Sequence, residues 1–242
     1  MSAVVRRTLK QIVGPRWTSR ARCLVRGKGL PRWGNLRRTA PFSANFGFDR
    51  GTPVDRYYLH RFLEAHRASI TGDVLEIQAP GYTERYGHDV GRADTVDIDP
   101  RFGPTYVVDL ARSRGVIPDA AYDCILLPNT LALLRDIEGC LAAALRIVKP
   151  GGVILASTSV FVPLLPDAPD YWRLSLAGWK EILGRVWQDA EVQAEAHGNC
   201  LAAVAAMLGL ASEELTGEEL EVTDERYPVL VTVRARRRGG RP

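Results

Sequence analysis

The feature that most constrains the fold is a series of short apolar runs between residues 72 and 157. The first run, at 72–77, is Gly-Asp-Val-Leu-Glu-Ile, and the last, at 153–157, is Val-Ile-Leu-Ala-Ser. Three more runs lie between them, at 95–99, 106–110 and 122–127. Short apolar runs bounded by turns predict strands that are buried on both faces, as in a parallel sheet. Parallel strands need covering helices, so the pattern predicts an α/β fold.

Helical patterns and two further strand patterns surround this series. A helix is expected at 54–68, because Thr52 suits an N-cap and Pro53 suits the first helical position. Four more helices are expected at 82–89, 135–148, 176–186 and 199–210. Two strands are expected at 190–196 and 227–235, a turn at 149–152, and an acidic loop at 213–225. The predicted fold is a doubly wound, mostly parallel, seven-stranded sheet with helices on both faces.

Acidic residues stand at or near the ends of the first three predicted strands. Asp97 follows Glu76 by about 20 residues, and Asp109 lies in the third run. A doubly wound nucleotide-binding unit places its ribose-hydroxyl ligand at about this distance from its first strand. Ligands of open α/β sheets bind at the carboxyl ends of the strands, so the binding site is expected at this edge.

Four of these segments together resemble the class I S-adenosylmethionine-dependent methyltransferases. The segment 74–77 resembles their first motif, 96–99 resembles their second, and 121–125 resembles their fourth strand with its Tyr-Asp entry. The helix and turn at 145–152 are the most specific match. The resemblance covers about residues 50 to 235. It implies the Rossmann-like methyltransferase fold, with one antiparallel strand, and S-adenosyl-L-methionine as the cofactor.

Two further segments narrow the resemblance. Residues 46–58 and 170–173 look like a bacterial subgroup associated with glycan or natural-product pathways. The resemblance thus implies a methyltransferase domain at 50–242, preceded by a basic extension or lid at 1–49. The implied reaction is in-line methyl transfer, without a metal, to a hydroxyl or amine of a small molecule such as a sugar or secondary metabolite.

The resemblance also implies a set of cofactor-binding residues at the carboxyl edge of the sheet. The loop after the first strand would wrap the methionine part, and Asp97 would accept both ribose hydroxyls. Asp109 would meet the adenine amino group, Leu110 would supply its backbone amide, and Ile98 would pack on the adenine face. The complete set is Glu76, Gln78, Ala79, Pro80, Gly81, Asp97, Ile98, Asp109, Leu110 and Asn129.

The loop after the first strand departs from the family pattern. The family carries Gly-x-Gly-x-Gly where this chain has Gln-Ala-Pro-Gly at 78–81. Glycine lets the backbone approach a ligand and adopt positive φ, so its loss bears on cofactor use. The departure leaves an alternative open: a methyltransferase-like protein without methyl transfer. It would be either a non-catalytic partner protein or a cofactor-assisted cyclase or isomerase.

The acceptor side offers fewer candidates. An oxygen acceptor needs a base, and His197, after a predicted strand, is the candidate catalytic residue. Lone histidines are more often structural, so that alternative stays open. Tyr171, Trp172 and Arg173 are candidate substrate-binding residues, by stacking and by holding an anion, although the aromatic pair equally suits a structural plug. Arg50, Asp55, Arg56 and Tyr57 are candidates for closing the pocket; Arg56 and Tyr57 are the predicted substrate contacts among them.

The charge of the chain is unevenly distributed. Residues 1–38 hold eleven Lys or Arg and no acid, whereas 39–233 hold sixteen basic and twenty-eight acidic residues. A basic arm can bind nucleic acid, anionic lipid or an acidic partner, or it can simply be solvated. A basic helix at 1–13 and a transit peptide are further interpretations of this arm. The acidic centre and the Pro-Asn-Thr at 128–130, in place of an Asn-Pro-Pro-Tyr motif, argue against a nucleic-acid partner.

Composition limits the remaining classes. The sequence has no uncharged apolar run long enough to span a membrane. Its four cysteines are scattered without a CxxC pair, which argues against zinc and disulfides and favours a reducing cytoplasm. Asp97 and Asp99 form an Asp-x-Asp pair, but two carboxylates alone are weak evidence for a metal. The expected partner is a small-molecule acceptor, and a homodimer is left open.

Overall fold

A computed structural model describes residues 32, 34–166 and 168–239. The expected helix at 1–13 lies outside the described residues. Before residue 41 the described chain contains one 3-10 turn, Gly34–Leu36. Residues 41–242 form a second compact unit, which contains every other element. The expected domain boundary between 49 and 50 stays a prediction.

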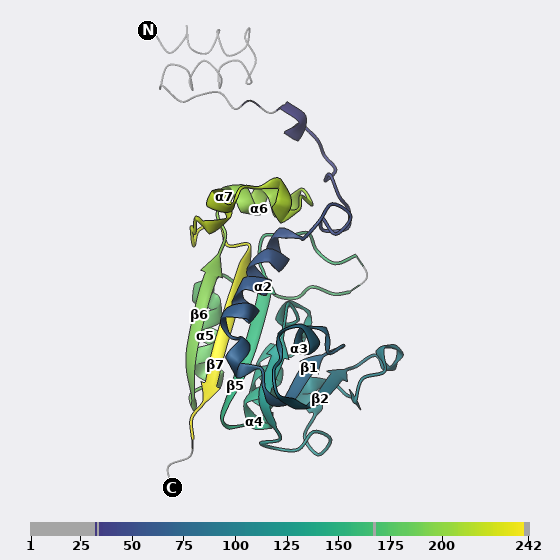
Figure 1. The fold of residues 1–242 in the computed structure, drawn as a ribbon, viewed down its shortest axis with the longest axis vertical. Coiled ribbons are helices and arrows are strands. Elements are labelled where there is room, and N and C mark those ends of the chain that lie inside the picture. The colour runs from purple at the N-terminus through teal and green to yellow at the C-terminus, as the bar shows by residue number, and fades with distance from the viewer. Residues whose placement is uncertain (1–31, 33, 167, 240–242) are drawn as a thin grey trace, which may run out of the picture. The chain divides into compact units, whose positions relative to one another are not determined.

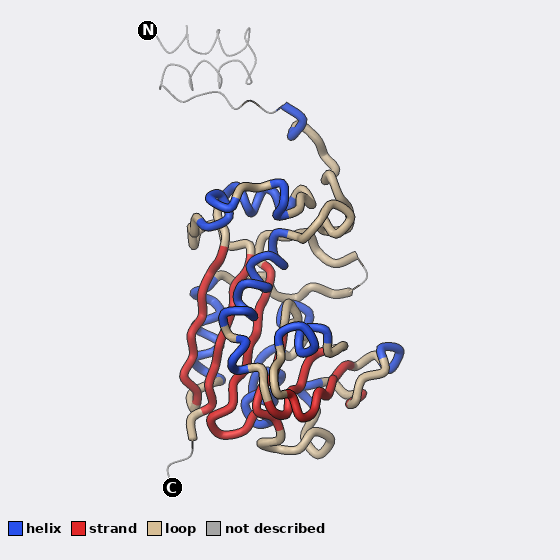
Figure 2. The backbone as a smooth tube through the Cα atoms, viewed as in Figure 1, coloured by secondary structure: helices blue, strands red, loops and turns tan. Residues whose placement is uncertain are grey.

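A seven-stranded sheet runs through this unit (Figures 1 and 2), in the order β3-β2-β1-β4-β5-β7-β6. Every pairing in it is parallel except the two that β7 makes with β5 and β6. The predicted mostly parallel seven-stranded sheet is therefore confirmed. The strands are β1 (Gly72–Ile77), β2 (Val90–Asp97), β3 (Tyr106–Val107), β4 (Tyr122–Leu127), β5 (Val148–Ser159), β6 (Ala190–His197) and β7 (Leu230–Arg237).

Helices cover both faces of the sheet. In Figure 1, α2 crosses in front of β5 and β7, while α5 lies behind the sheet. The helices are α2 (Val54–Ala65), α3 (Gly81–Tyr86), α4 (Ile137–Ile147), α5 (Leu176–Val186), α6 (Cys200–Met207) and α7 (Gly217–Glu221). Five more 3-10 turns complete the unit: Arg67–Ser69, Pro100–Phe102, Leu110–Arg112, Leu131–Leu133 and Ser212–Glu214.

The central strand β4 shows why the sequence specifies two cores. Its side chains alternate between the faces, because successive residues of a strand point to opposite sides. Ile125 and Leu127 pack in the core under α4 and α5. Cys124 and Leu126 pack in the core under α2 and α6. All four are buried, which explains the unbroken apolar run.

Several element ends differ from the prediction for local reasons. Helix α4 starts at Ile137 rather than 135, because the Asp136 side chain caps it by accepting from Gly139 N at 2.9 Å. Strand β5 starts at Val148, so the predicted turn at 149–152 is part of an irregular strand start. The predicted acidic loop is wrong in part. It contains α7, whose start is stabilised by a capping box between Thr216 and Glu219.

Among the described residues, no helix combines the length and the apolar character that a membrane crossing requires.

Candidate cofactor cleft and acceptor cavity

A cavity of about 710 Å³ lies at the carboxyl ends of β1, β2 and β4. The strand order reverses between β1 and β4, and open α/β sheets bind ligands at such a point. We call this cavity the cofactor cleft. Nine predicted cofactor-binding residues line it: Glu76, Gln78, Ala79, Gly81, Asp97, Ile98, Asp109, Leu110 and Asn129. Pro80 is not among the lining residues and occupies the N-cap position of α3.

Glu76 holds the loop after β1 in place. Its carboxylate accepts hydrogen bonds from Tyr82 N (3.0 Å), Thr83 N (2.8 Å) and Thr83 Oγ1 (2.6 Å). The side chain is buried, with 2% of the residue exposed. Burial raises the pKa of Glu76, and the hydrogen bonds from Thr83 and Tyr82 act in the opposite direction. Glu76 therefore anchors the start of α3, which carries the loop 78–81 with it.

Gln78 takes up the conformation that the missing glycine would favour. Its φ is +68°, in the left-handed region that costs a residue with a side chain roughly 1–2 kcal/mol. The turn is held by Gln78 N, which donates to Val96 O (3.0 Å), and by Ala79 N, which donates to Ile77 O (2.8 Å). Gly81, the glycine that the loop retains, needs no such freedom, since an added Cβ would meet nothing within 4 Å. The loop thus keeps a tight turn despite its sequence.

Asp97 ends β2 inside the cleft. Its Oδ1 accepts from Asp99 N at 2.8 Å, and its side chain is partly exposed. Asp99 also lines the cleft, but its carboxylate is held by the Arg101 guanidinium at 2.9 Å. This contact lowers the pKa of Asp99. No group of three metal-ligating side chains occurs in the part of the chain that the structure describes.

The far end of the cleft combines an apolar wall with one carboxylate. Leu110 is buried, whereas Ile98 is 72% exposed and Phe102 is also exposed, so both can cover a flat ring. Asp109 Oδ1 accepts from Ala111 N at 3.0 Å and caps the 3-10 turn that follows. Capping uses only Oδ1, so it is compatible with the predicted contact between Asp109 and an adenine amino group.

A second cavity, of about 230 Å³, adjoins the cofactor cleft. We call it the acceptor cavity. The two share four lining residues: Arg56, Asn129, Leu133 and Leu165. The acceptor cavity is otherwise lined by Asn45, Phe46, Phe48, Asp55, Ala132, Ser159, Val162, Pro163, Asp170 and Arg173. The start of α2, the end of β5 and two loops therefore meet beside the predicted cofactor site.

Asp55 is the centre of a buried hydrogen-bond network in this cavity. Its Oδ2 accepts from Asn129 Nδ2 (2.8 Å), Ser159 Oγ (2.9 Å) and Arg56 Nη1 (2.9 Å). Asn129 is fixed in turn by Ser157, whose Oγ donates to Asn129 Oδ1 at 2.9 Å. From the sequence, Asp55 was expected only to close the pocket, and Ser159 was not expected in the site. No local pattern in the sequence indicated that Asp55 and Ser159 would be hydrogen-bonded, because they lie 104 residues apart.

Arg173 makes different contacts from those predicted. Its guanidinium donates to the carbonyls of Ser159 (3.2 Å), Val160 (3.1 Å) and Pro163 (3.4 Å), and it pairs with Asp170. The Asp170 side chain is buried. The side chain that was expected to hold an anion is thus engaged with the chain itself. It fixes the segment that forms one wall of the acceptor cavity.

The predicted aromatic wall is not found. The Trp172 indole donates to Leu134 O at 2.8 Å and packs against the core under α4 and α5. Tyr171 N donates to Ala132 O at 2.8 Å, and the Tyr171 side chain is largely exposed. Neither residue lines the cofactor cleft or the acceptor cavity. Trp172 therefore fits the alternative of a structural plug, because its indole N–H is hydrogen-bonded and its ring is packed within the chain.

His197 lies apart from both cavities, which corrects its assignment as the base. It ends β6, the edge strand beyond β7, and its Nε2 lies 2.7 Å from Thr232 Oγ1. Its ring stacks on Tyr58 with centroids 6.0 Å apart. Burial lowers the pKa of His197. A histidine packed under α2 in this way is structural, as the alternative interpretation stated.

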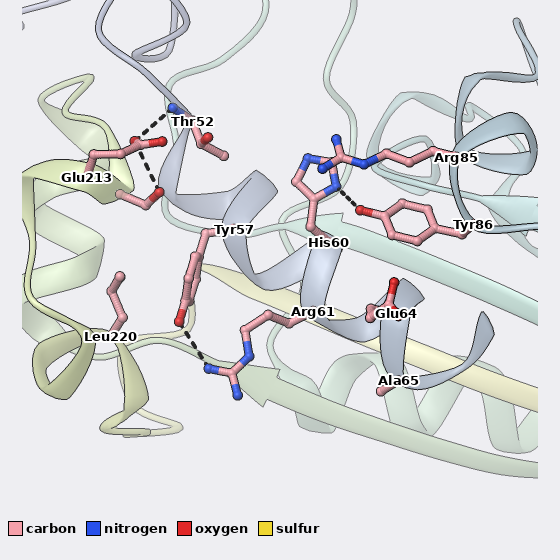
Figure 3. A pocket seen from close by; sticks show the side chains of 11 residues that line it. Thr52, Tyr57, His60, Arg61, Glu64, Ala65, Arg85, Tyr86, Glu213 and Leu220 are labelled. Carbon is pink, nitrogen blue, oxygen red and sulfur yellow. Dashed lines mark hydrogen bonds between the residues drawn. The ribbon is translucent and has the colours of Figure 1, made fainter.

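Tyr57 also points away from the predicted substrate. It lines a separate open hollow of about 870 Å³ between α2, α3 and the segment around Glu213 (Figure 3). In that hollow Arg61 Nη1 donates to Tyr57 Oη at 3.0 Å. Among the described residues, the hollow shares none with the cofactor cleft or the acceptor cavity. Of the predicted substrate residues, Arg56 and Arg173 line the acceptor cavity.

Comparisons with known proteins agree at the level of the fold. No protein-family model and no curated protein matches the sequence. An S-adenosylmethionine-dependent methyltransferase from Archaeoglobus fulgidus has a TM-score of 0.50 and 16% identity, covering 81% of this chain and 100% of that chain. One from Mesorhizobium loti has a TM-score of 0.49 and 15% identity, covering 73% and 96%.

A structure of the [4+2]-cyclase SpnF has a TM-score of 0.48 and 18% identity, covering 83% of this chain and 87% of that chain. The three similar structures named above are thus two S-adenosylmethionine-dependent methyltransferases and one cyclase. At these identities the likeness shows the fold alone. The chain has the Rossmann-like methyltransferase fold, with its seven-stranded, mostly parallel sheet.

Proposed function

We propose that this chain binds S-adenosylmethionine in the cofactor cleft and transfers its methyl group to a hydroxyl or amine of a small molecule, such as a sugar or a secondary metabolite. When bound, the cofactor supplies an activated methyl group on a sulfonium. The chain's own residues bind the cofactor, orient the acceptor and exclude water from the reacting atoms.

The observation that carries this proposal is the meeting of nine predicted residues around one cavity at the switch in strand order. The donor set fits the cofactor chemically. Asp97 offers a carboxylate oxygen to hydroxyl groups at one end, and Ile98 and Leu110 offer apolar surface to a flat ring beside it. The loop at 78–81 would hold the methionine part.

The absence of the family's glycines from the loop at 78–81 does not remove the cleft. Because Gln78 adopts positive φ, the chain makes a tight turn at the end of β1 and the cavity stays open. This favours cofactor use over the interpretation as a partner protein. Product mass tests the remaining alternative, since methylation adds a methyl group and a cyclisation or isomerisation leaves the mass unchanged.

The first prediction concerns Asp97. Calorimetric titration with S-adenosylhomocysteine should give saturable binding to the wild-type chain. Asp97→Ala should weaken it more than about tenfold, because a charge-assisted hydrogen bond in a partly buried site is lost. Asp119→Ala is the matched control: it removes an exposed carboxylate that pairs with Arg146, away from the cleft, and should bind as the wild type does. Absence of binding to the wild-type chain at millimolar ligand would contradict the proposed function.

A further inference from the structure

We propose that the acceptor cavity binds a compact, largely apolar head group through its hydroxyl or amino group, and that Asp55 accepts the proton of that group. The inference rests on the proposed function, since it assigns the acceptor side of the same site. It places the base on α2, in the cavity that adjoins the cofactor cleft.

The two cavities are joined by a short polar path. Asn129 lines both of them, and its Nδ2 lies 2.8 Å from Asp55 Oδ2. Arg56 also lines both and contacts the same oxygen. Asp55 is therefore one hydrogen bond away from the wall of the cofactor cleft. An acceptor in this cavity would present its protic group beside the methyl donor.

The hydrogen bonds of Asp55 leave one of its oxygens for a ligand. All three donors, from Arg56, Asn129 and Ser159, meet Oδ2. Within the described chain no hydrogen bond reaches Oδ1, and 12% of the side chain is exposed where it lines the cavity. A carboxylate with one oxygen fixed by three donors is oriented in advance, as a general base must be.

The charges around the cavity are already paired with one another. Arg56 contacts Asp55, and Arg173 contacts Asp170 while also donating to three carbonyls. Among the described residues that line the cavity, no charged side chain is thus left to balance an ionised acceptor. A neutral group that donates one hydrogen bond to Asp55 satisfies the site.

The other walls of the cavity are apolar. Phe46, Phe48, Leu133, Val162 and Leu165 line it. Phe48 is 53% exposed, and the segment 161–165 also presents exposed large apolar side chains. Exposed apolar surface beside a pocket marks a binding site for an apolar ligand. At about 230 Å³ the cavity is smaller than a drug-sized site, so it takes a head group whose remainder can rest on this surface.

The proton and electron balance of the step is simple. The acceptor oxygen or nitrogen forms a bond to the methyl carbon with its lone pair. The carbon–sulfur bond breaks, and its electron pair stays on sulfur. Asp55 takes the acceptor's proton, so the methylated product leaves neutral.

The test uses the full chain, saturated with S-adenosylhomocysteine, and three probes: 4-methylphenol, its methyl ether 4-methylanisole, and methyl β-D-glucopyranoside. Calorimetry should show that 4-methylphenol binds about tenfold more tightly than 4-methylanisole, the order expected for a hydrogen bond to a charged group. It should also bind more tightly than the glucoside. A parallel titration with 4-methylaniline reports whether the amine is accepted as well.

Asp55→Asn should reduce the preference for 4-methylphenol over its ether to less than about threefold, since the charged acceptor is gone. Glu64→Gln, the same change on the exposed side of α2, should keep the wild-type preference. Should Asp55→Asn fail to fold, Phe48→Ala provides a second variant at an exposed position. It should weaken both aromatic probes equally, because it removes apolar contact only.

The outcomes separate the two proposals. If S-adenosylhomocysteine fails to bind, the proposed function and the proton-transfer role of Asp55 are both overturned. If it binds but the wild-type chain does not distinguish 4-methylphenol from its ether, only this inference is overturned. Tighter binding of the glucoside would overturn the inference that the acceptor is largely apolar and would favour a sugar as the acceptor.

Discussion

At the scale of the residue, Gln78 links backbone strain to the proposed cofactor site. It holds a left-handed conformation in the wall of the cleft, where its side chain lines the cavity. Strain of this kind persists only where the surroundings enforce it, and it gathers at ligand sites. Glu76 supplies the enforcement, since its three hydrogen bonds fix the chain that follows the loop.

Gln78→Gly should therefore separate stability from binding. Relief of the positive φ is expected to raise the free energy of unfolding by about 1 kcal/mol, measured by urea denaturation. Affinity for S-adenosylhomocysteine should fall a few-fold, because a lining side chain is lost. Ala120→Gly is the control: Ala120 also has positive φ (+48°) but lies on an exposed turn, so stability should rise and affinity should not change.

Residues of the cleft were predictable to the extent that their spacing is local. Asp97 was predicted because about 20 residues separate it from Glu76, the distance that a strand, a connection and a second strand require, and it lines the cleft in the structure. The network of Asp55 was not found. Its partner Asn129 is 74 residues away, and only the packing of α2 against the ends of β4 and β5 brings the side chains together.

At the scale of the element, one guanidinium ties together the two ends of the segment that follows β5. Arg173 spans the segment by bonding the carbonyls of Ser159, Val160 and Pro163 at one end and Asp170 at the other. The sequence suggested an anion-binding arginine at this position. It could not reveal that backbone oxygens would occupy the side chain first.

Arg173→Ala should loosen this segment. We expect the free energy of unfolding to fall by about 3 kcal/mol, because the buried Asp170 carboxylate loses its partner. The affinity of the acceptor cavity for 4-methylphenol should fall, while that of the cleft for S-adenosylhomocysteine should change little. Arg226→Ala breaks an exposed pair with Asp224 and should leave both stability and binding as in the wild type. An equal loss of stability in both variants would contradict the role of Arg173.

Element types were more predictable than element ends. The apolar runs identified strands β1 to β5, and the run is fully buried in β4, which lies inside the sheet. Strand β2 nevertheless starts at Val90, well before the predicted 95, because its first residues pair with β1 without forming an apolar run. Helix α3 spans Gly81–Tyr86 and ends earlier than the predicted 82–89, and Glu76 accepts hydrogen bonds from its first turn.

At the scale of the whole molecule, three partly buried histidines gather around α2: His60 within it, His66 at its C-cap, and His197, which stacks on Tyr58. Burial lowers the pKa of His60, His66 and His197 below the ordinary value. Each of them therefore binds its proton less readily in the folded chain, so below about pH 6.5 the unfolded chain binds more protons. Their contribution to stability is present above that pH and is lost as the pH falls.

Urea unfolding midpoints at pH 8.0 and pH 5.5 test this. The wild-type midpoint should be lower at pH 5.5, although the raised pKa of Glu76 works in the opposite direction at the acidic end. His197→Gln should narrow the difference between the two midpoints, because the amide can still meet Thr232 but does not titrate. An unchanged difference between the two midpoints would show that His197 does not contribute to the pH dependence of stability.

The division of the site between strand ends and irregular segments has a practical consequence for redesign. Glu76 and Asp97 belong to the sheet, while the walls of the acceptor cavity come mostly from residues 45–48 and 160–173, which no strand pairing constrains. A chimera that exchanges only these two segments is expected to alter the accepted head group, and it would change the cofactor cleft only where Leu165, Ala168 and Pro169 line it. Asp55, Glu76 and Asp97 would stay in place in such a chimera, because they lie on α2, β1 and β2.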